Sequence, residues 1–152
     1  MQKNIIKLDV ATRRGSVLNG ALFPSPVNAD ALVIAITGIH GNFYSNPFYY
    51  DIGGALNTAG IDFAYAQTRN AFGVIKTRNV LAKKEESIGS WNERFADTDE
   101  DIVAYLDEAE RRGYRHIVLA GHSLGANKVV YYLSRYHDPR VEHFIQIGRA
   151  HV

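Results

Sequence analysis

The stretch LAGHSLGAN, which spans Leu119 to Asn127, decides how the rest of this chain is interpreted. Its centre matches the pattern G-x-S-x-G, with the residues Gly121, His122, Ser123, Leu124 and Gly125. A short apolar run, Ile117 to Ala120, leads into the pattern, and an amphipathic segment, Leu124 to Tyr136, leads away from it. This order predicts a strand, a sharp turn and a helix, which together lift a serine hydroxyl above the end of a sheet.

The residue types around Ser123 fit the chemistry of a serine nucleophile. Gly121 and Gly125 allow the backbone to approach its neighbours without a Cβ clash. The N-terminus of the following helix directs backbone N–H groups at developing negative charge, and we expect the N–H of Leu124 to bind an oxyanion. His122 occupies the variable position of the pattern and is expected to pack beside the sheet. The alternative is that Ser123 only caps the helix.

A second motif, His40-Gly41-Asn42, follows the apolar run Ala31 to Thr37. With this loop and the GHSLG pattern, the sequence resembles the α/β-hydrolase family over about residues 4–145. The segments TGIHGNF, AYAQTRNAFG and GHSLGANKVVYYLS are similar to bacterial members of unassigned substrate. The resemblance implies that the backbone N–H of Asn42 is the second oxyanion donor, with Phe43 the next candidate. It also implies that His40 and Gly41 shape this loop, and that His40 is not the catalytic base.

The predicted fold class is α/β, with a mostly parallel sheet and helices on both faces, because strand and helix patterns alternate along the chain. Two strands, Asn4 to Val10 and Ser16 to Phe23, precede this alternation. The later strands are expected at Ala31 to Thr37, Ile61 to Ala66, His116 to Ala120 and Val141 to Ile145. The helices are expected from Pro47 with Asn46 as the N-cap, to about Arg112 after a cap at Thr98 or Asp99, and from Leu124 to Tyr136.

Several local features of these elements are also predicted. In the last helix Val129, Val130 and Leu133 should face inward. Asp107/Arg111 and Glu108/Arg112 should form pairs four residues apart. Residues 68–91 are the least patterned part, where Lys83 to Glu86 indicates a solvated turn. A long substrate-facing loop and a small hairpin around Thr77 to Asn79 both stay open for this segment.

The chain ends soon after the predicted nucleophile, although the histidine and the carboxylate of such a triad normally follow the serine. The last residues, IGRAHV (147–152), resemble the translation of a common sequencing-library adapter followed by a stop codon. We therefore expect residues 1–146 to be an incomplete α/β-hydrolase domain, truncated after the strand that follows the nucleophile helix, and residues 147–152 to be a non-native tail. On this interpretation His151 is not a catalytic base, and the fragment by itself is inactive.

Composition and net charge reduce the number of possible function classes further. The chain has 152 residues, 46% of them hydrophobic, a net charge of +1 and no cysteine. This charge is too small for strong attraction to nucleic acid or to an anionic membrane, and no apolar run is long enough to span a bilayer. We expect no metal site and no cofactor, a cytoplasmic location, and a small-molecule acyl substrate. The oligomeric state is not specified by the sequence.

Two functions are carried forward from the sequence. The first is the N-terminal portion of a serine hydrolase that cleaves carboxyl esters, or thioesters or amides, through an acyl-enzyme. The second is a non-catalytic α/β module that binds a small ligand in the same pocket. An intact small interaction protein, for which the stop codon is genuine, is a third interpretation.

Overall fold

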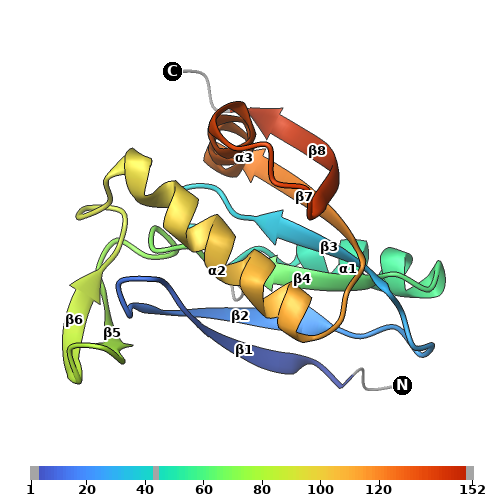
Figure 1. Ribbon diagram of the computed structural model, residues 1–152, viewed down its shortest axis with the longest axis horizontal. Helices are drawn as coiled ribbons and strands as arrows, with labels where there is room; N and C mark the ends of the chain where they lie inside the picture. Colours follow the sequence, from blue (N-terminus) through green and yellow to red (C-terminus); the bar gives the residue numbers. More distant parts are fainter. Residues whose placement is uncertain (1–3, 43–44, 150–152) are drawn as a thin grey trace.

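A six-stranded sheet runs through the molecule in the order β1-β2-β4-β3-β7-β8, and a separate two-stranded hairpin, β5–β6, lies at one end (Figure 1). The computed structural model describes residues 4–42 and 45–149. The strands are β1 (Ile6–Ala11), β2 (Val17–Phe23), β3 (Ala31–Ile36), β4 (Asp62–Ala66), β5 (Ile75–Asn79), β6 (Lys84–Ile88), β7 (His116–Ser123) and β8 (Val141–Arg149). The α-helices are α1 (Phe48–Thr58), α2 (Thr98–Arg111) and α3 (Leu124–Arg135), and a 3₁₀ turn, η1 (Phe95–Asp97), precedes α2.

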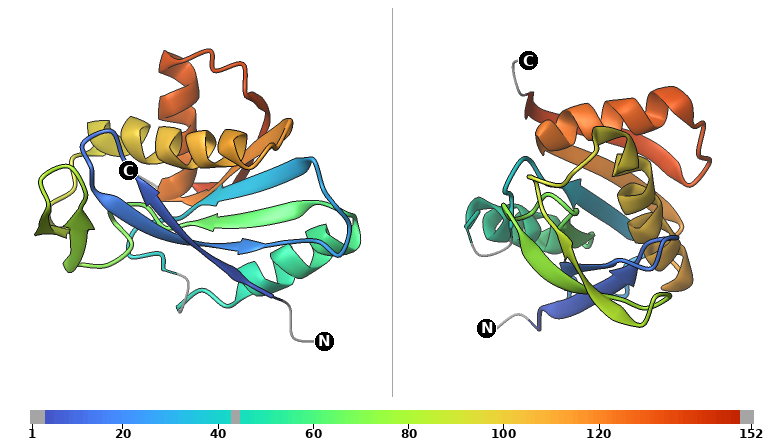
Figure 2. Two further views of the ribbon diagram at one scale, coloured as in Figure 1. Left: turned by 60° about the horizontal axis from the view of Figure 1, so that its bottom comes forward. Right: turned by 90° about the vertical axis from the view of Figure 1, so that its left-hand side faces the viewer.

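The central strands are parallel, and helices cover both faces of the sheet. β3 pairs in parallel with β4 and β7, and β7 with β8, whereas β1 and β2 are antiparallel additions. α2 and α3 lie on one face and α1 on the other (Figure 2). Along β3, Ile34 and Ile36 join the core beneath α2 and α3, while Val33 and Ala35 join the core beneath α1. This arrangement confirms the predicted fold class, and it explains why β3 is apolar at consecutive positions.

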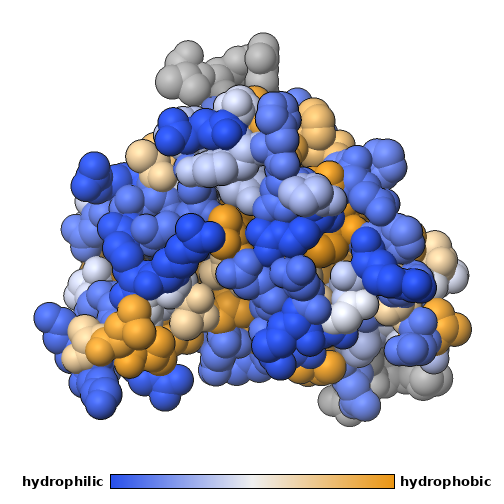
Figure 3. Space-filling model, viewed as in Figure 1, coloured by the Kyte–Doolittle hydropathy of each residue, from blue (hydrophilic) through white to orange (hydrophobic). Residues whose placement is uncertain are grey.

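Residues 75–88 form a hairpin, which was one of the two alternatives for this segment, but Thr77 to Asn79 lie within β5 and not at the centre of the hairpin as predicted. Lys84 to Glu86 belong to β6 and are not part of a solvated turn; the turn is made by residues 80–83, with Lys83 at φ 53°. The Thr77 hydroxyl donates to the Val17 carbonyl over 2.6 Å, which ties β5 to β2. Apolar side chains are exposed at the hairpin tip, where Leu81 is 67% exposed, and a patch of apolar residues is visible over this end of the molecule (Figure 3).

The last strand is longer than predicted. β8 runs from Val141 to Arg149, so the prediction that the strand ends at Ile145 was wrong. Gln146, Ile147 and Arg149 continue the parallel register opposite Gly121, His122 and Ser123 of β7. Backbone pairing is nearly independent of side-chain identity, so the edge of β7 can hold this segment whatever its origin. The proposed non-native character of residues 147–152 stays a prediction.

Two details of the helices correct the sequence-based expectations. Val130 is 43% exposed, and Lys128 occupies the fully buried position beside Val129 instead. The helix ends at Arg135 and not at Tyr136. Helical rotation of about 100° per residue turns Val130 away from the stripe that Val129 and Tyr132 define. The prediction that Val130 is buried, which rested on its apolar side chain alone, was therefore wrong.

The predicted charge pairs on α2 are only partly formed. Glu108 binds both Arg111 and Arg112, each at 2.7 Å, so the Glu108/Arg112 pair is confirmed. Asp107 does not pair with Arg111 but binds Arg140, from the turn before β8, at 2.7 Å. Asp107 therefore pairs with a residue that is distant in the sequence in place of its neighbour on the helix. The spacing of charges within one helix does not predict such a pair.

The N-caps of two helices differ from the predicted Asn46 and from the predicted Thr98 or Asp99 by one or two residues. α1 begins at Phe48 with Pro47 as its cap, and α2 begins at Thr98 with Asp97 as its cap. Neither cap residue makes a side-chain hydrogen bond to its helix. In the part of the chain that the structure describes, no helix is long and apolar enough to cross a membrane.

The ion pair of Asp138 with Arg140 predicts a pH-dependent stability. Arg140 Nη2 donates to Asp138 over 2.6 Å, and the Tyr132 hydroxyl donates to the same carboxylate over 2.6 Å. The hydrogen bonds from Arg140 lower the pKa of Asp138 from 3.8 to about 2. The carboxylate therefore contributes stability that is present above pH 3.8 and is lost as the pH falls through about 2.

We expect Asp138→Asn to lower the free energy of unfolding at pH 7 by about 1–2 kcal/mol. The difference from the wild type should shrink as the pH falls from 4 to 2. Urea denaturation at several pH values measures both effects. Asp30→Asn, which removes the exposed partner of Arg115, is the matched control and should leave the unfolding midpoint unchanged. A difference of the same size at pH 7 and pH 2.5 would contradict the assignment.

β8 forms one edge of the sheet and exposes apolar side chains, with Phe144 53% and Ile145 47% exposed. Edges of this kind pair with other chains unless they are covered or charged. We expect the chain of residues 1–152 to self-associate in a concentration-dependent way, and Phe144→Lys to reduce this association. Sedimentation velocity over a range of concentrations is the measurement. A monodisperse, cooperatively melting monomer would contradict the prediction.

Candidate active site

Ser123 lies at the junction of β7 and α3 with an unusual backbone conformation. Its dihedral angles are φ 55° and ψ −125°, a region that residues with a side chain rarely adopt. Such a conformation persists only where the surrounding structure enforces it, and it is concentrated at functional sites. Ser123 makes no side-chain hydrogen bond to the helix that it precedes, so the alternative in which it serves only as a cap is wrong.

Close packing of backbone around the turn enforces this geometry. A Cβ added at Gly125 would lie 2.1 Å from the carbonyl oxygen of Ile36 and 2.7 Å from that of Thr37. At Gly121 it would lie 2.5 Å from the Cα atom of Ala126. The first turn of α3 therefore rests directly on the end of β3. These contacts are the close approaches for which the two glycines were expected.

A third glycine, Gly38, was not singled out from the sequence. A Cβ at Gly38 would lie 2.9 Å from Cβ and 3.2 Å from Oγ of Ser123. The loop after β3 consequently passes directly against the serine side chain. The sequence feature that could have identified Gly38 is its position just after a buried strand and two residues before His40.

Several hydrogen bonds fix the loop of residues 38–42. The Thr37 hydroxyl donates to the Gly41 carbonyl over 3.1 Å, and the Gly41 N–H donates to the Gly38 carbonyl over 3.0 Å. The His40 N–H donates to the Asn70 carbonyl over 3.0 Å, and Nε2 of His40 lies 2.6 Å from the Ser90 hydroxyl. His40 thus connects its loop to two other segments, which suits the predicted role of shaping the loop.

The predicted oxyanion donors lie on the two segments that meet at Ser123. Leu124 is the first residue of α3, and Asn42 ends the described part of the loop after β3. The Asn42 side chain is engaged locally, because its Nδ2 donates to the His40 carbonyl over 3.1 Å and its Oδ1 accepts from the Ser45 N–H over 3.1 Å. Phe43, the next candidate, falls outside the described residues.

His122 packs as expected, and none of the described histidines is hydrogen-bonded to Ser123. The His122 ring packs against Phe48, with ring centroids 5.3 Å apart, and against Tyr49 at 6.2 Å. His116 binds Glu142 at the opposite end of β7, and His137 is exposed. Within residues 4–42 and 45–149, no group of three His, Cys, Asp or Glu side chains is arranged to hold a metal ion.

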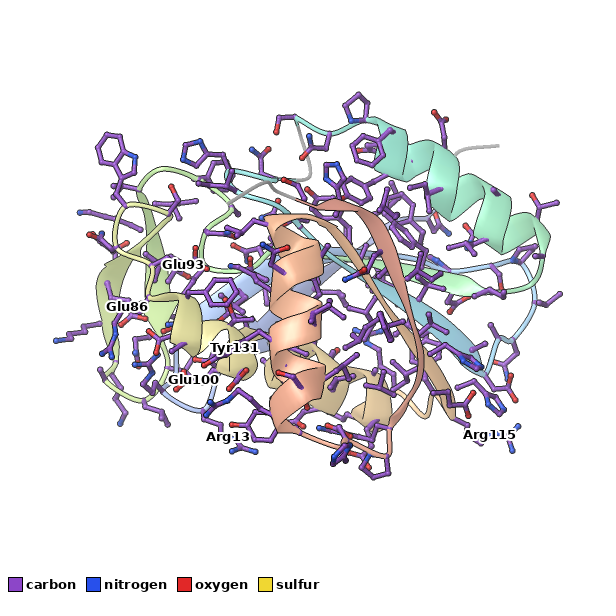
Figure 4. The ribbon with its side chains drawn as sticks, turned by 90° about the horizontal axis from the view of Figure 1, so that it is seen from above. Arg13, Glu86, Glu93, Glu100, Arg115 and Tyr131 are labelled. Carbon is purple, nitrogen blue, oxygen red and sulfur yellow. The ribbon has the colours of Figure 1, made fainter. Side chains whose placement is uncertain are left out.

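A buried polar layer that sequence analysis did not identify lies beside the site. Residues 67–70, directly after β4, are all buried. Arg69 donates two hydrogen bonds to Asp101 of α2, over 2.9 and 2.8 Å, and Asp101 is fully buried. Glu93 and Glu100 lie at this same end of the molecule, whereas Arg115 lies at the other (Figure 4). The sequence feature that could have identified this layer is the polar run QTRN. It follows a buried strand at the end of the sheet where α/β proteins carry their sites.

Lys128 of α3 belongs to a second buried ion pair in this region. Its side chain is 0% exposed and is paired with Glu93, whose side chain is 8% exposed. Burial lowers the pKa of Lys128, and the neighbouring Glu93 opposes this shift. Neither residue stands out in the sequence, because a lysine in an amphipathic helix is normally solvated.

Several solved structures share the fold of this chain. The chain is similar to the α/β hydrolase GrgF from Penicillium, with a TM-score of 0.72 and 17% identity over 98% of this chain and 46% of that one. It is similar to a Pyrococcus furiosus esterase (TM-score 0.67, 16% identity, 91% of this chain and 49% of that one). It is also similar to the esterase domain of a Rhodothermus marinus protein (0.64, 20%, 98% and 51%).

These similarities establish the fold of α/β hydrolases and esterases, and the chain spans about half the length of the chains that it matches. No protein-family model and no curated protein matches the sequence.

The contact at Gly125 gives a stability prediction. We expect Gly125→Ala to lower the free energy of unfolding by about 3 kcal/mol or more, because a methyl group would overlap backbone atoms of β3 that cannot rotate away. Gly73→Ala is the matched control, since its Cβ would lie 3.5 Å from the Trp91 ring in ordinary contact. Chemical denaturation of both variants makes the comparison, and equal small losses would show that the turn does not depend on this contact.

Proposed function

We propose that this chain is the N-terminal portion of a serine hydrolase in which Ser123 is the nucleophile, with carboxyl esters as substrates and thioesters and amides as the next candidates. The observation that carries the proposal is the strained backbone of Ser123, at φ 55°, with its hydroxyl free of any capping role. A strained serine between a buried strand and a helix N-terminus is the geometry that exposes a hydroxyl for attack.

In the proposed reaction, Ser123 Oγ attacks the acyl carbonyl of a small-molecule substrate. The resulting oxyanion accepts hydrogen bonds from the N–H groups of Leu124 and Asn42, each worth about 3–4 kcal/mol in the transition state. The alcohol leaves, and water then hydrolyses the acyl-enzyme to return Ser123. Neither a cofactor nor a metal takes part in this scheme.

The hydroxyl proton of Ser123 has to pass to a base. We propose that a histidine and a carboxylate supplied by a longer parent protein fill these roles, and that residues 1–152 by themselves do not turn over substrate. The proposal is supported by the length of the solved relatives, of which this chain covers 46–51% in the three described above. It is also supported by the engagement of His40 with Ser90 and of His122 with aromatic rings.

Substitution of Ser123 in the full-length protein tests this function. We expect Ser123→Ala to lower kcat/KM for p-nitrophenyl esters by about 10³-fold or more. Ser123→Gly should remove activity equally but raise the free energy of unfolding by about 1 kcal/mol, because glycine adopts φ 55° without strain. Hydrolysis rates and thermal melts of the two variants provide both readouts.

A wild-type protein that binds a small ligand but neither hydrolyses esters nor reacts with a fluorophosphonate would support the non-catalytic alternative. Hydrolysis that persists in both variants would exclude Ser123 as the nucleophile.

A further inference from the structure

The buried ion pair of Lys128 with Glu93 joins the helix that follows Ser123 to the segment of residues 89–93. Lys128 is 0% exposed, and the Glu93 side chain is 8% exposed. Glu93 lies at the end of the molecule where α2 begins, close to α3 (Figure 4). The same region holds Arg69 and Asp101, which also interact electrostatically with Lys128. A charge has therefore been placed where helical periodicity calls for an apolar residue.

Stability does not explain this choice of residues. Removing two charges from water costs several kcal/mol for each ion, and well-packed apolar side chains of similar volume are often at least as stabilising. A salt bridge differs from an apolar contact in being directional, because it holds two groups at one distance and orientation. The pair is thus suited to fixing the position of residues 89–93 relative to α3.

Residues 89–93 in turn hold the loop after β3. The Ser90 hydroxyl lies 2.6 Å from Nε2 of His40. The Ser90 N–H donates to the Phe72 carbonyl over 2.8 Å, and the Trp91 N–H donates to the Gly73 carbonyl over 3.2 Å. A Cβ at Gly89 would lie 2.2 Å from the Gly73 carbonyl oxygen, so the segment is packed closely on this side as well. The short stretch of chain from Ser90 to Glu93 therefore contacts His40 at one end and Lys128 at the other.

We propose that Lys128 and Glu93 are positioning residues of the active site, which act through Ser90 and His40 to set the loop of residues 38–42 at the correct distance from Ser123. The two ends of this connection belong to the two halves of the proposed oxyanion hole, because Lys128 lies on the helix that begins at Leu124 and His40 lies in the loop that carries Asn42. The inference rests on the proposed function for its effect on catalysis. Its structural part, the coupling of residues 89–93 to residues 38–42, does not.

Glu93→Gln in the full-length protein tests the coupling directly. We expect the amides of His40 and Gly41, both hydrogen-bonded in the structure, to exchange with deuterium about tenfold faster than in the wild type. We expect kcat for ester hydrolysis to fall about 10- to 100-fold with KM nearly unchanged, because misplacement of an oxyanion donor affects the transition state more than the bound ester. Lys128→Met should have the same two effects.

Two further variants separate positioning from stability. Asp138→Asn removes a different ion pair, at the far end of α3, and should lower stability without changing kcat or the exchange of His40 and Gly41. The double variant Lys128→Met/Glu93→Gln leaves no unpaired buried charge, so it should recover much of the stability lost by either single variant but not the lost kcat.

A double-mutant cycle tests the route through Ser90. Ser90→Ala removes the contact with His40 and should itself reduce kcat. If Glu93 acts through Ser90, the variant Ser90→Ala/Glu93→Gln should be no slower than the slower single variant. Additive losses in kcat would overturn this route.

Failure of the inference is distinguishable from failure of the proposed function. If Ser123→Ala retains hydrolysis, the function is wrong, but hydrogen exchange still decides the coupling. If Ser123→Ala is inactive while Glu93→Gln leaves the exchange of His40 and Gly41 at the wild-type rate, Lys128 and Glu93 do not position the loop.

Discussion

The contact between the first turn of α3 and the end of β3 is the constraint on which the rest of the structure depends. Gly125 lies so close to the Ile36 and Thr37 carbonyls that a single methyl group does not fit between them. This closeness requires β7 to pair directly with β3, and it forces the chain to reverse within Ser123, which takes the strained conformation as a result. The same contact brings Gly38 against Ser123, so the loop after β3 and the N-terminus of α3 face a common point.

Around this point the molecule uses buried charge where a core would normally be apolar. Arg69 and Asp101 join the segment after β4 to α2, and Lys128 and Glu93 join α3 to the segment before η1. These pairs lie at the carboxyl end of the parallel strands, which is where open α/β sheets carry their sites. The opposite end of the sheet is held by different contacts, such as the 2.5 Å hydrogen bond from the Tyr114 hydroxyl to Asp62. Hydrogen-bonded ion pairs hold their partners at defined distances and orientations, which apolar packing does less strictly. The paired charges near Ser123 therefore suit a site that needs a precise geometry.

β8 pairs with the edge of the sheet through its backbone, and its side chains contribute little to this pairing. Its backbone follows β7 as far as Arg149, although its side chains are mostly exposed and few of them contribute to the core. In the solved relatives, of which this chain covers about half, further chain is present beyond the part that is matched. A longer parent protein would therefore have an apolar edge, with Phe144 and Ile145, available for additional elements to cover.

The sequence by itself determined the fold class, the turn at Ser123 and the loop at His40, because each depends on patterns among residues that are close together in the chain. Periodicity and turn chemistry report such local structure directly. The tertiary structure alone decided that Gly38 touches Ser123, that Asp107 binds Arg140 and not Arg111, and that Lys128 is buried while Val130 is exposed. It also decided between a loop and a hairpin for residues 75–88, through the hydrogen bond of Thr77 to Val17. These features depend on contacts between residues that are far apart in the sequence. Such contacts produce no periodic pattern in either of the two segments, so the sequence alone does not predict them.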